Sequence, residues 1–161
     1  GKTCAAVNIA EQWKKKRNIF VVVPASLVGN FRNELRSKCA NDEYLNDQER
    51  IILKKSHPTS VEYKNIIEKS DNRIDKYYNI YSNNKFIRNV ELNEIDLTDA
   101  VLIIDEVQNI VSESGKYYQI IYNLIKDAPQ NLKIILLSAT PMFDKPVEIA
   151  LTLNLLKLPK E

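Results

Sequence analysis

The sequence has no long apolar run and no cluster of cysteines, and both absences exclude classes of protein. No apolar stretch approaches the roughly 18–20 residues that span a bilayer, and no secretory signal pattern opens the chain, so we expect no membrane partner. Cys4 and Cys39 lie far apart, without a CxxC motif or nearby histidines, which argues against a disulfide framework and a zinc site. We expect two buried or half-buried thiols in an intracellular, reducing compartment.

Positive and negative charges nearly balance, and the sequence has a single histidine. The net charge of +2 is too small to indicate nucleic-acid binding by itself, so any such binding needs a local basic patch. The single histidine, His57, stands before a proline, which favours a loop residue over a metal ligand or a catalytic base. The 161 residues suffice for one domain with a substantial core.

The most informative stretch is a buried apolar run that leads into two carboxylates. Residues 101–104 are all apolar, which predicts a strand covered on both faces, and Asp105, Glu106 and then Gln108 follow. Two acids at the carboxyl end of such a strand suit a magnesium nucleotide, because one can hold the metal's water shell and the other can accept a proton from an attacking water. A solvated acidic turn is the alternative for the dipeptide alone.

The chain opens with Gly1, Lys2 and Thr3, followed by a helical stretch at 4–13. This is the second half of a phosphate-binding loop, in which backbone N–H groups cradle phosphates, the lysine reaches the outer phosphates and the hydroxyl binds magnesium. A chance match is the alternative for three residues alone. We expect a fragment of a longer protein that lacks the strand before this loop.

A second buried strand is predicted at 19–23 and is ended by Pro24, Ala25 and Ser26. Ser26 or a neighbour is expected to cap a helix with an apolar residue at every fourth position. These core-facing residues are Leu27, Phe31 and Leu35. The turn offers N–H donors and a hydroxyl for a nucleic-acid phosphate, although an ordinary strand-to-helix loop has the same composition.

The middle of the chain, at about 41–76, has the character of a helical insertion. Two short amphipathic helices are predicted at 41–53 and 61–69, broken by Pro58 and packed on the edge of the sheet. A strand at 77–81 should follow, with Ser82 in a turn or as a helix cap.

The last third repeats the alternation of helix and strand. A helix is predicted at 117–126, a buried strand at 133–137 and a strongly apolar helix at 147–156. The strand at 133–137 delivers a polar tetrapeptide at its carboxyl end. This tetrapeptide consists of Ser138, Ala139, Thr140 and Pro141.

The order of these motifs resembles the first RecA-like domain of a superfamily 2 helicase or translocase. Residues 21–35 and 136–156 of this chain are similar to the Swi/Snf-type branch of that superfamily. They especially resemble the helicases of large DNA viruses, of the type of the poxvirus early transcription factor small subunit. The resemblance implies an α/β fold, with a RecA-like three-layer α/β/α arrangement around a mainly parallel sheet. It also implies ATP and Mg²⁺ as cofactors, and a virion or host cytoplasm as the location.

The resemblance assigns roles residue by residue. Gly1 and Lys2 would bind the phosphates, Thr3 and Asp105 would hold magnesium, and Glu106 would polarise the attacking water. Gln108 would link the nucleotide to a neighbouring domain. The residues that would couple hydrolysis to nucleic acid are Ser138, Ala139 and Thr140. Those that would touch the nucleic-acid backbone are Pro24, Ala25, Ser26, Tyr81 and Ser82.

Three functions are compatible with this resemblance. The first is an ATP-driven translocase or helicase, with DNA favoured over RNA and a role in viral-type early transcription. The second is a transcription or remodelling ATPase that does not separate strands, and the third is a non-enzymatic RecA-like scaffold. The family's second RecA-like domain carries an arginine finger worth about 10³–10⁵ in rate, so without it we expect these residues to be nearly inactive alone.

Overall fold

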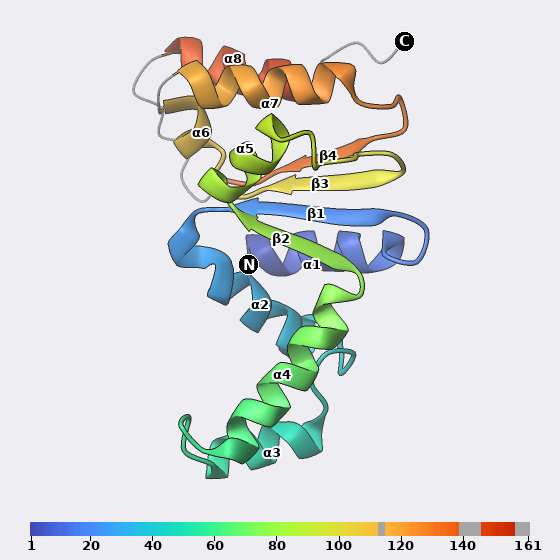
Figure 1. The fold of residues 1–161 in the computed structure, drawn as a ribbon, viewed down its shortest axis with the longest axis vertical. Coiled ribbons are helices and arrows are strands. Elements are labelled where there is room, and N and C mark those ends of the chain that lie inside the picture. Colours follow the sequence, from blue (N-terminus) through green and yellow to red (C-terminus); the bar gives the residue numbers. More distant parts are fainter. Residues whose placement is uncertain (113–114, 139–145, 157–161) are drawn as a thin grey trace.

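The computed structural model describes residues 1–112, 115–138 and 146–156. Its centre is a four-stranded, wholly parallel sheet in the order β2-β1-β3-β4 (Figure 1). The strands are β1 (Asn18–Val23), β2 (Tyr78–Ser82), β3 (Ala100–Ile104) and β4 (Lys133–Leu136). All four were predicted, and the α/β class with helices on both faces of a parallel sheet is confirmed.

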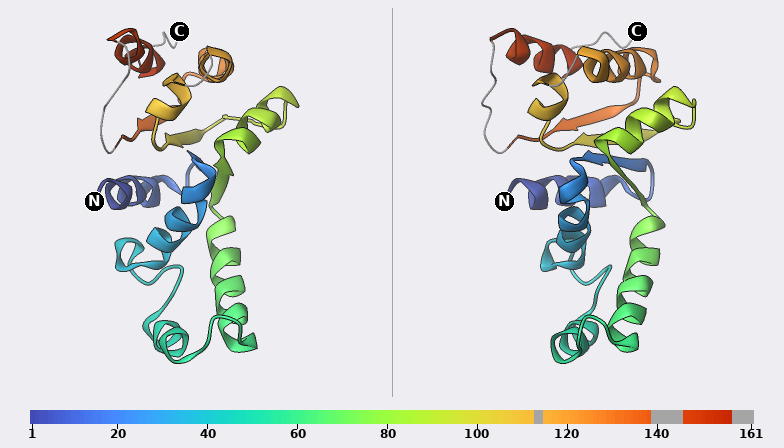
Figure 2. Two further views of the ribbon diagram at one scale, coloured as in Figure 1. Left: turned by 90° about the vertical axis from the view of Figure 1, so that its left-hand side faces the viewer. Right: turned by 60° about the vertical axis from the view of Figure 1, so that its left-hand side comes forward.

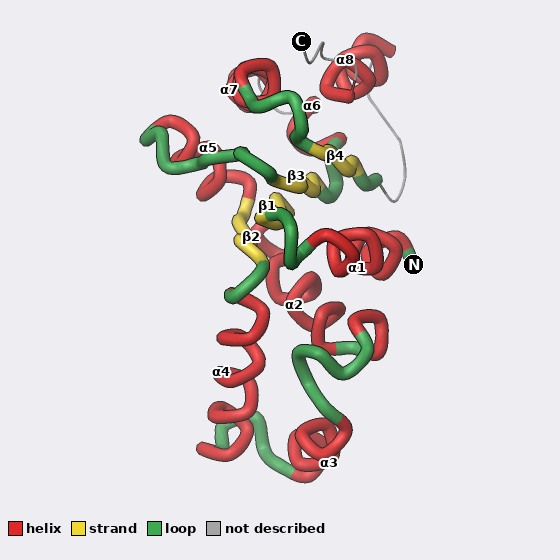
Figure 3. Tube along the Cα trace, turned by 90° about the vertical axis from the view of Figure 1, so that its right-hand side faces the viewer, coloured by secondary structure: helices red, strands yellow, loops and turns green. Residues whose placement is uncertain are grey.

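Helices cover both faces of this sheet (Figure 3). One layer contains α1 (Lys2–Trp13) and α2 (Val28–Arg36), which follows a short turn, η1 (Ala25–Leu27). The opposite layer contains α5 (Asn83–Glu91), α6 (Gln108–Ser112), α7 (Gly115–Asp127) and α8 (Pro146–Leu156). The sequence patterns did not predict α5 or α6 as helices.

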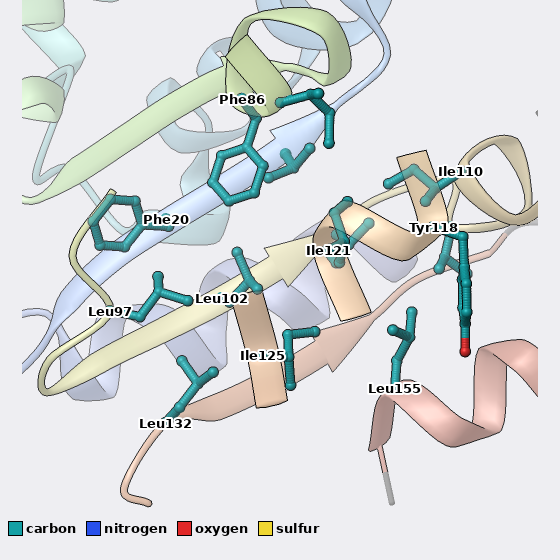
Figure 4. Packing of buried hydrophobic residues seen from close by; sticks show 14 of the residues in the cluster. Phe20, Phe86, Leu97, Leu102, Ile110, Tyr118, Ile121, Ile125, Leu132 and Leu155 are labelled. Atoms are coloured by element: carbon teal, nitrogen blue, oxygen red, sulfur yellow. The ribbon is translucent and has the colours of Figure 1, made fainter. Parts of the chain in front are cut away.

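Alternate residues of the central strands supply two separate cores. In β3, Leu102 and Ile104 face α5–α8, whereas Val101 and Ile103 face α1 and α2. Figure 4 shows Leu102 among Phe86, Ile121 and Ile125 in the first of these cores. A strand buried on both faces needs apolar residues at consecutive positions, which explains the unbroken run in β3.

The two edge strands are less buried than the two central ones. For β4 the prediction of full burial was wrong, because Ile134, Ile135 and Leu136 are only partly buried. Within the described sheet β4 pairs on one side alone, with β3. An apolar run therefore identified the strand without revealing its place in the sheet.

The insertion forms two helices, α3 (Asp47–Lys55) and α4 (Val61–Asp75), which project away from the sheet layers (Figure 2). It is not packed along the sheet edge as predicted, since α3 lies at the far end of the projection and the C-terminal part of α4 leads back to β2. Asn46 caps α3 in a capping box with Glu49, so this helix begins later than predicted. Ser60 caps α4 by accepting from Tyr63 N at 3.2 Å.

Charged side chains brace this projection against the core. Arg73 on α4 donates two hydrogen bonds to the Glu49 carboxylate on α3, at 2.7 and 3.0 Å. Arg36 on α2 donates to Ser70 Oγ at 2.9 Å and also binds Asp71. Arginine contacts and the burial of Ile74 of α4 in the core together attach the insertion.

Two local predictions were wrong. Cys4 and Cys39 are not separate thiols, because a disulfide joins them, and the cysteines no longer indicate a reducing compartment. Ser26 does not cap α2. That helix has Leu27 at its N-cap position and no side-chain cap within the described part of the chain.

Where the structure describes the chain, no helix combines the length and apolar character needed to cross a membrane.

Candidate nucleotide site

The candidate functional residues gather at the carboxyl edge of the sheet. The register pairs Val23 of β1 with Ser82 of β2, and Ile104 of β3 with Leu136 of β4, so the four strands end side by side. The N-terminus, where α1 begins, lies on the side toward which the strand arrows point (Figure 1). Parallel topology thus brings residues at opposite ends of the chain to one edge.

Lys2 contacts both carboxylates that follow β3. Its Nζ donates to Asp105 Oδ1 at 2.5 Å and to Glu106 Oε1 at 2.8 Å. Asp105 is buried, at 5% exposure, while the Lys2 side chain remains 30% exposed. The resemblance had assigned these three residues to one site, and the structure brings them into direct contact across more than 100 residues of sequence.

The contacts with Asp105 and Glu106 raise the pKa of Lys2. Partial burial by itself lowers the pKa of the ammonium group, but the hydrogen bonds to Asp105 and Glu106 outweigh this effect and leave the pKa above its ordinary value. Lys2 therefore stays charged at neutral pH, and its single positive charge reduces the repulsion between the two adjacent acids.

The backbone at Glu106 is held in an unusual conformation. Its φ is 51°, in the left-handed region that residues other than glycine rarely adopt. On one side Asp105 N donates to Val22 O at 2.8 Å, and on the other Val107 N donates to Leu137 O at 3.1 Å. These bonds to both neighbouring strands fix the turn and so determine where the Glu106 carboxylate points.

Gln108 connects the acid pair to the end of β4. Its Nε2 donates to Glu106 Oε2, and its Oε1 accepts from Ser138 Oγ at 2.9 Å. A continuous polar chain therefore runs from Lys2 through Glu106 and Gln108 to Ser138. Ala139 and Thr140, predicted as coupling residues, lie outside the described residues.

The residues predicted to touch nucleic acid lie at the ends of β1 and β2. Ala25 and Ser26 are exposed and Pro24 is partly exposed, all in the turn after β1. Ser82 caps α5 by accepting from Lys85 N at 3.3 Å.

The Tyr81 ring packs against two other aromatic rings. It stacks on Phe20 with ring centroids 6.4 Å apart and meets Phe86 edge-on at 5.6 Å. The packing of Tyr81 therefore involves both β1 and α5, and leaves the residue partly buried.

A cavity of about 250 Å³ opens between α1 and α2 above the acid pair. Lys2 and Thr3 line one wall, and residues from Leu27 to Glu34 line the other. Asp105 and Glu106 line this same cavity. Mg²⁺ prefers oxygen donors such as carboxylates and hydroxyls, so this set of side chains fits magnesium. Thr3 and Asp105 are the candidate ligands.

Sequence patterns missed several contributors to this cavity. Asn30 and Glu34 lie on α2, and only the packing of α2 beside α1 brings them to the cavity. A spacing of four residues does place both on one helix face, but nothing in the sequence identifies the cavity that this face lines.

A family model described as the SNF2-related domain matches residues 3–160. The chain belongs to the SNF2-related domain family of superfamily 2 helicases. The match begins at Thr3, so Lys2 lies outside the matched residues. Its contacts with the acid pair are known from the structure alone.

Relatives and solved structures agree with this SNF2-related assignment. The chain is 59% identical over 156 residues to a protein of Acanthamoeba polyphaga mimivirus named "Putative ATP-dependent RNA helicase R563", covering 97% of this chain and 27% of that protein. It is 28% identical over 179 residues to "Putative helicase 087L" of Invertebrate iridescent virus 3, covering 97% of this chain and 17% of that protein. The chain thus spans about a quarter or less of the length of these relatives.

Among solved structures, the chain resembles the Sulfolobus solfataricus SWI2/SNF2 ATPase core in complex with dsDNA, with a TM-score of 0.56 at 19% identity. The match covers 96% of this chain and 29% of that one. At this identity the likeness shows a shared RecA-like fold.

Proposed function

We propose that residues 1–161 form the partial first RecA-like domain of a nucleic-acid-dependent ATPase that acts as a helicase or translocase. One observation carries the proposal: Lys2 lies within hydrogen-bond distance of both Asp105 and Glu106 at the carboxyl edge of an SNF2-related fold. A lysine and two acids around one phosphate-binding edge are the parts that phosphoryl transfer needs.

Each residue has a distinct task in hydrolysis. Lys2 would exchange its carboxylate partners for the outer phosphates of ATP. Glu106, whose backbone is fixed by the neighbouring strands, would accept a proton from the attacking water. Magnesium, when bound near Thr3 and Asp105, supplies positive charge that stabilises the transferring phosphoryl group.

We favour DNA over RNA as the track. The solved neighbour is bound to dsDNA, whereas the mimivirus relative is named as an RNA helicase, so both must be tested. We propose that Pro24, Ala25, Ser26 and Ser82 meet the phosphate backbone and that a second RecA-like domain completes the track. A role in viral-type early transcription, in the infected cell or the virion, is the corresponding biological proposal.

The decisive experiment measures ATP binding and hydrolysis by the full-length protein, with duplex DNA, single-stranded RNA or neither. Glu106→Gln should retain ATP binding and lose about 10²–10⁴ in turnover, the usual contribution of a positioned base. Glu94→Gln removes an exposed carboxylate elsewhere and should behave as wild type. Normal hydrolysis by Glu106→Gln would show that the base is misassigned.

Two further measurements separate the alternatives. Strand displacement compared with translocation on duplex DNA distinguishes a helicase from a transcription or remodelling ATPase. Absence of ATP binding in the full-length protein would favour the non-enzymatic scaffold. The 161 residues alone should show almost no turnover, and robust DNA-stimulated hydrolysis by them would refute the need for a second domain.

A further inference from the structure

The Cys4–Cys39 disulfide joins the two walls of the candidate nucleotide cavity. Cys4 follows Thr3 in the first turn of α1, and Cys39 lies in η2 (Lys38–Ala40), just beyond the end of α2. The wall opposite Lys2 and Thr3 is made by η1 and α2. The covalent bond therefore ties the first turn of α1 to the segment that directly follows α2, the helix of the opposite wall.

Glu34 shows how close the bond lies to the cavity. One of its carboxylate oxygens is within 4.8 Å of the sulfur atoms of both cysteines, and the same residue lines the cavity. The disulfide therefore lies directly beside a residue of the cavity wall.

Local hydrogen bonds make η2 a firm attachment point for the disulfide. Ser37 Oγ accepts from Cys39 N at 3.1 Å and donates to Glu34 O at 2.5 Å. These bonds tie η2 to the last turn of α2, so a restraint on Cys39 is also a restraint on α2. The disulfide thus sets the distance between two helices rather than that between two loops.

The size of the cavity indicates the direction of the effect. At about 250 Å³ it is smaller than the roughly 300–1,000 Å³ of typical ligand pockets, and Lys2, which lines it, is held by the acid pair. Entry of a nucleoside triphosphate would displace Lys2 from the acid pair and press on both walls, and a covalent bond between the elements that form them opposes their separation.

We propose that the Cys4–Cys39 disulfide is a redox-controlled clamp that restricts nucleotide entry and is released by a dithiol reductant. This inference rests on the proposed function, because it assumes that the cavity binds ATP. Release is a two-electron exchange: the dithiol supplies two electrons and two protons, the S–S bond becomes two thiols, and the dithiol becomes a disulfide. Both cysteines are only partly buried, so a small reductant can reach them. Hydrogen peroxide reverses the step, taking both thiol hydrogens and forming two waters.

The test compares ATP hydrolysis by the full-length protein after treatment with hydrogen peroxide or with dithiothreitol. Peptide mass mapping with and without reduction establishes whether Cys4 and Cys39 are linked in each sample. The KM for ATP should be about fivefold or more higher in the oxidised protein, at the lower end of usual coupling between sites. Cys39→Ser, and Cys39→Ala as a second variant, should have the low KM in both treatments.

The outcomes are distinguishable. Equal KM values in samples that differ in the mapped disulfide would overturn the clamp while leaving the ATPase proposal intact. A redox effect that persists in Cys39→Ser would also overturn it, because other cysteines would then be responsible. Absence of ATP hydrolysis in every sample would instead refute the proposed function. The reduced wild type provides a comparison without any substitution, in case a variant folds poorly.

Discussion

Reduction of the Cys4–Cys39 disulfide should lower the free energy of unfolding of the chain by about 4 kcal/mol. The two cysteines are 35 residues apart in sequence. Closing a loop of that length removes about 13 cal/mol/K of entropy from the unfolded chain, which is about 4 kcal/mol at 25 °C. The Ser37 cap of η2 involves neither sulfur atom, so we assign the stability effect mainly to the unfolded chain.

Urea unfolding of the 161-residue chain, followed by far-ultraviolet circular dichroism, measures this difference. The chain contains only these two cysteines, so no other disulfide can form within it. With a urea slope of about 1–3 kcal/mol/M, the midpoint should fall by roughly 1.3–4 M on reduction. Cys39→Ser should unfold at the reduced midpoint in both conditions. A difference below about 1 kcal/mol between the two states would refute the loop-closure reasoning.

Two other predictions concern the core and the insertion. Ile121→Ala should lower the free energy of unfolding by about 2–5 kcal/mol because Ile121 is fully buried. Ile51→Ala, at a 52% exposed position, should change the free energy of unfolding by no more than about 0.5 kcal/mol. Urea unfolding measures both effects. The hydrogen bonds from Arg73 hold the pKa of Glu49 below its ordinary value of 4.5, so their stabilisation is present above that pH and is lost as the pH falls through the lower folded pKa. Urea midpoints from pH 6 to 3 should therefore fall less steeply in Glu49→Gln, and an identical slope would contradict the assignment.

The fold was largely predictable because three of the four described strands, β1, β3 and β4, are apolar runs next to polar or proline residues. β1 and β3 are buried on both faces, and their composition follows directly from that position. The partial burial of β4 was not predictable, because an apolar run does not determine whether a strand pairs with other strands on one side or on both. The projection of α3 and α4 was also missed, because amphipathic helices indicate an apolar contact without locating it.

The acid pair and its lysine were predictable from the order of motifs, whereas the disulfide was not. Lys2, Asp105 and Glu106 each stand beside a recognisable strand or helix end, and parallel topology then forces them to one edge. Cys39 lies in a short turn after α2, and its approach to Cys4 depends on how that turn packs against α1. Spacing along the chain contains no signal for such a contact.

The left-handed conformation of Glu106 explains why the site depends on the whole sheet rather than on its motif alone. A residue with a Cβ pays roughly 1–2 kcal/mol in this region, so the conformation persists only where the surroundings impose it. Here the imposing contacts come from both neighbours of β3, through Val22 O and Leu137 N–H and O. Glu106 Oε1 then meets Lys2, and Oε2 meets Gln108, which continues to Ser138. A displacement of β4 relative to β3 would therefore reorient the carboxylate, which makes the packing of the sheet itself a determinant of the chemistry at its edge.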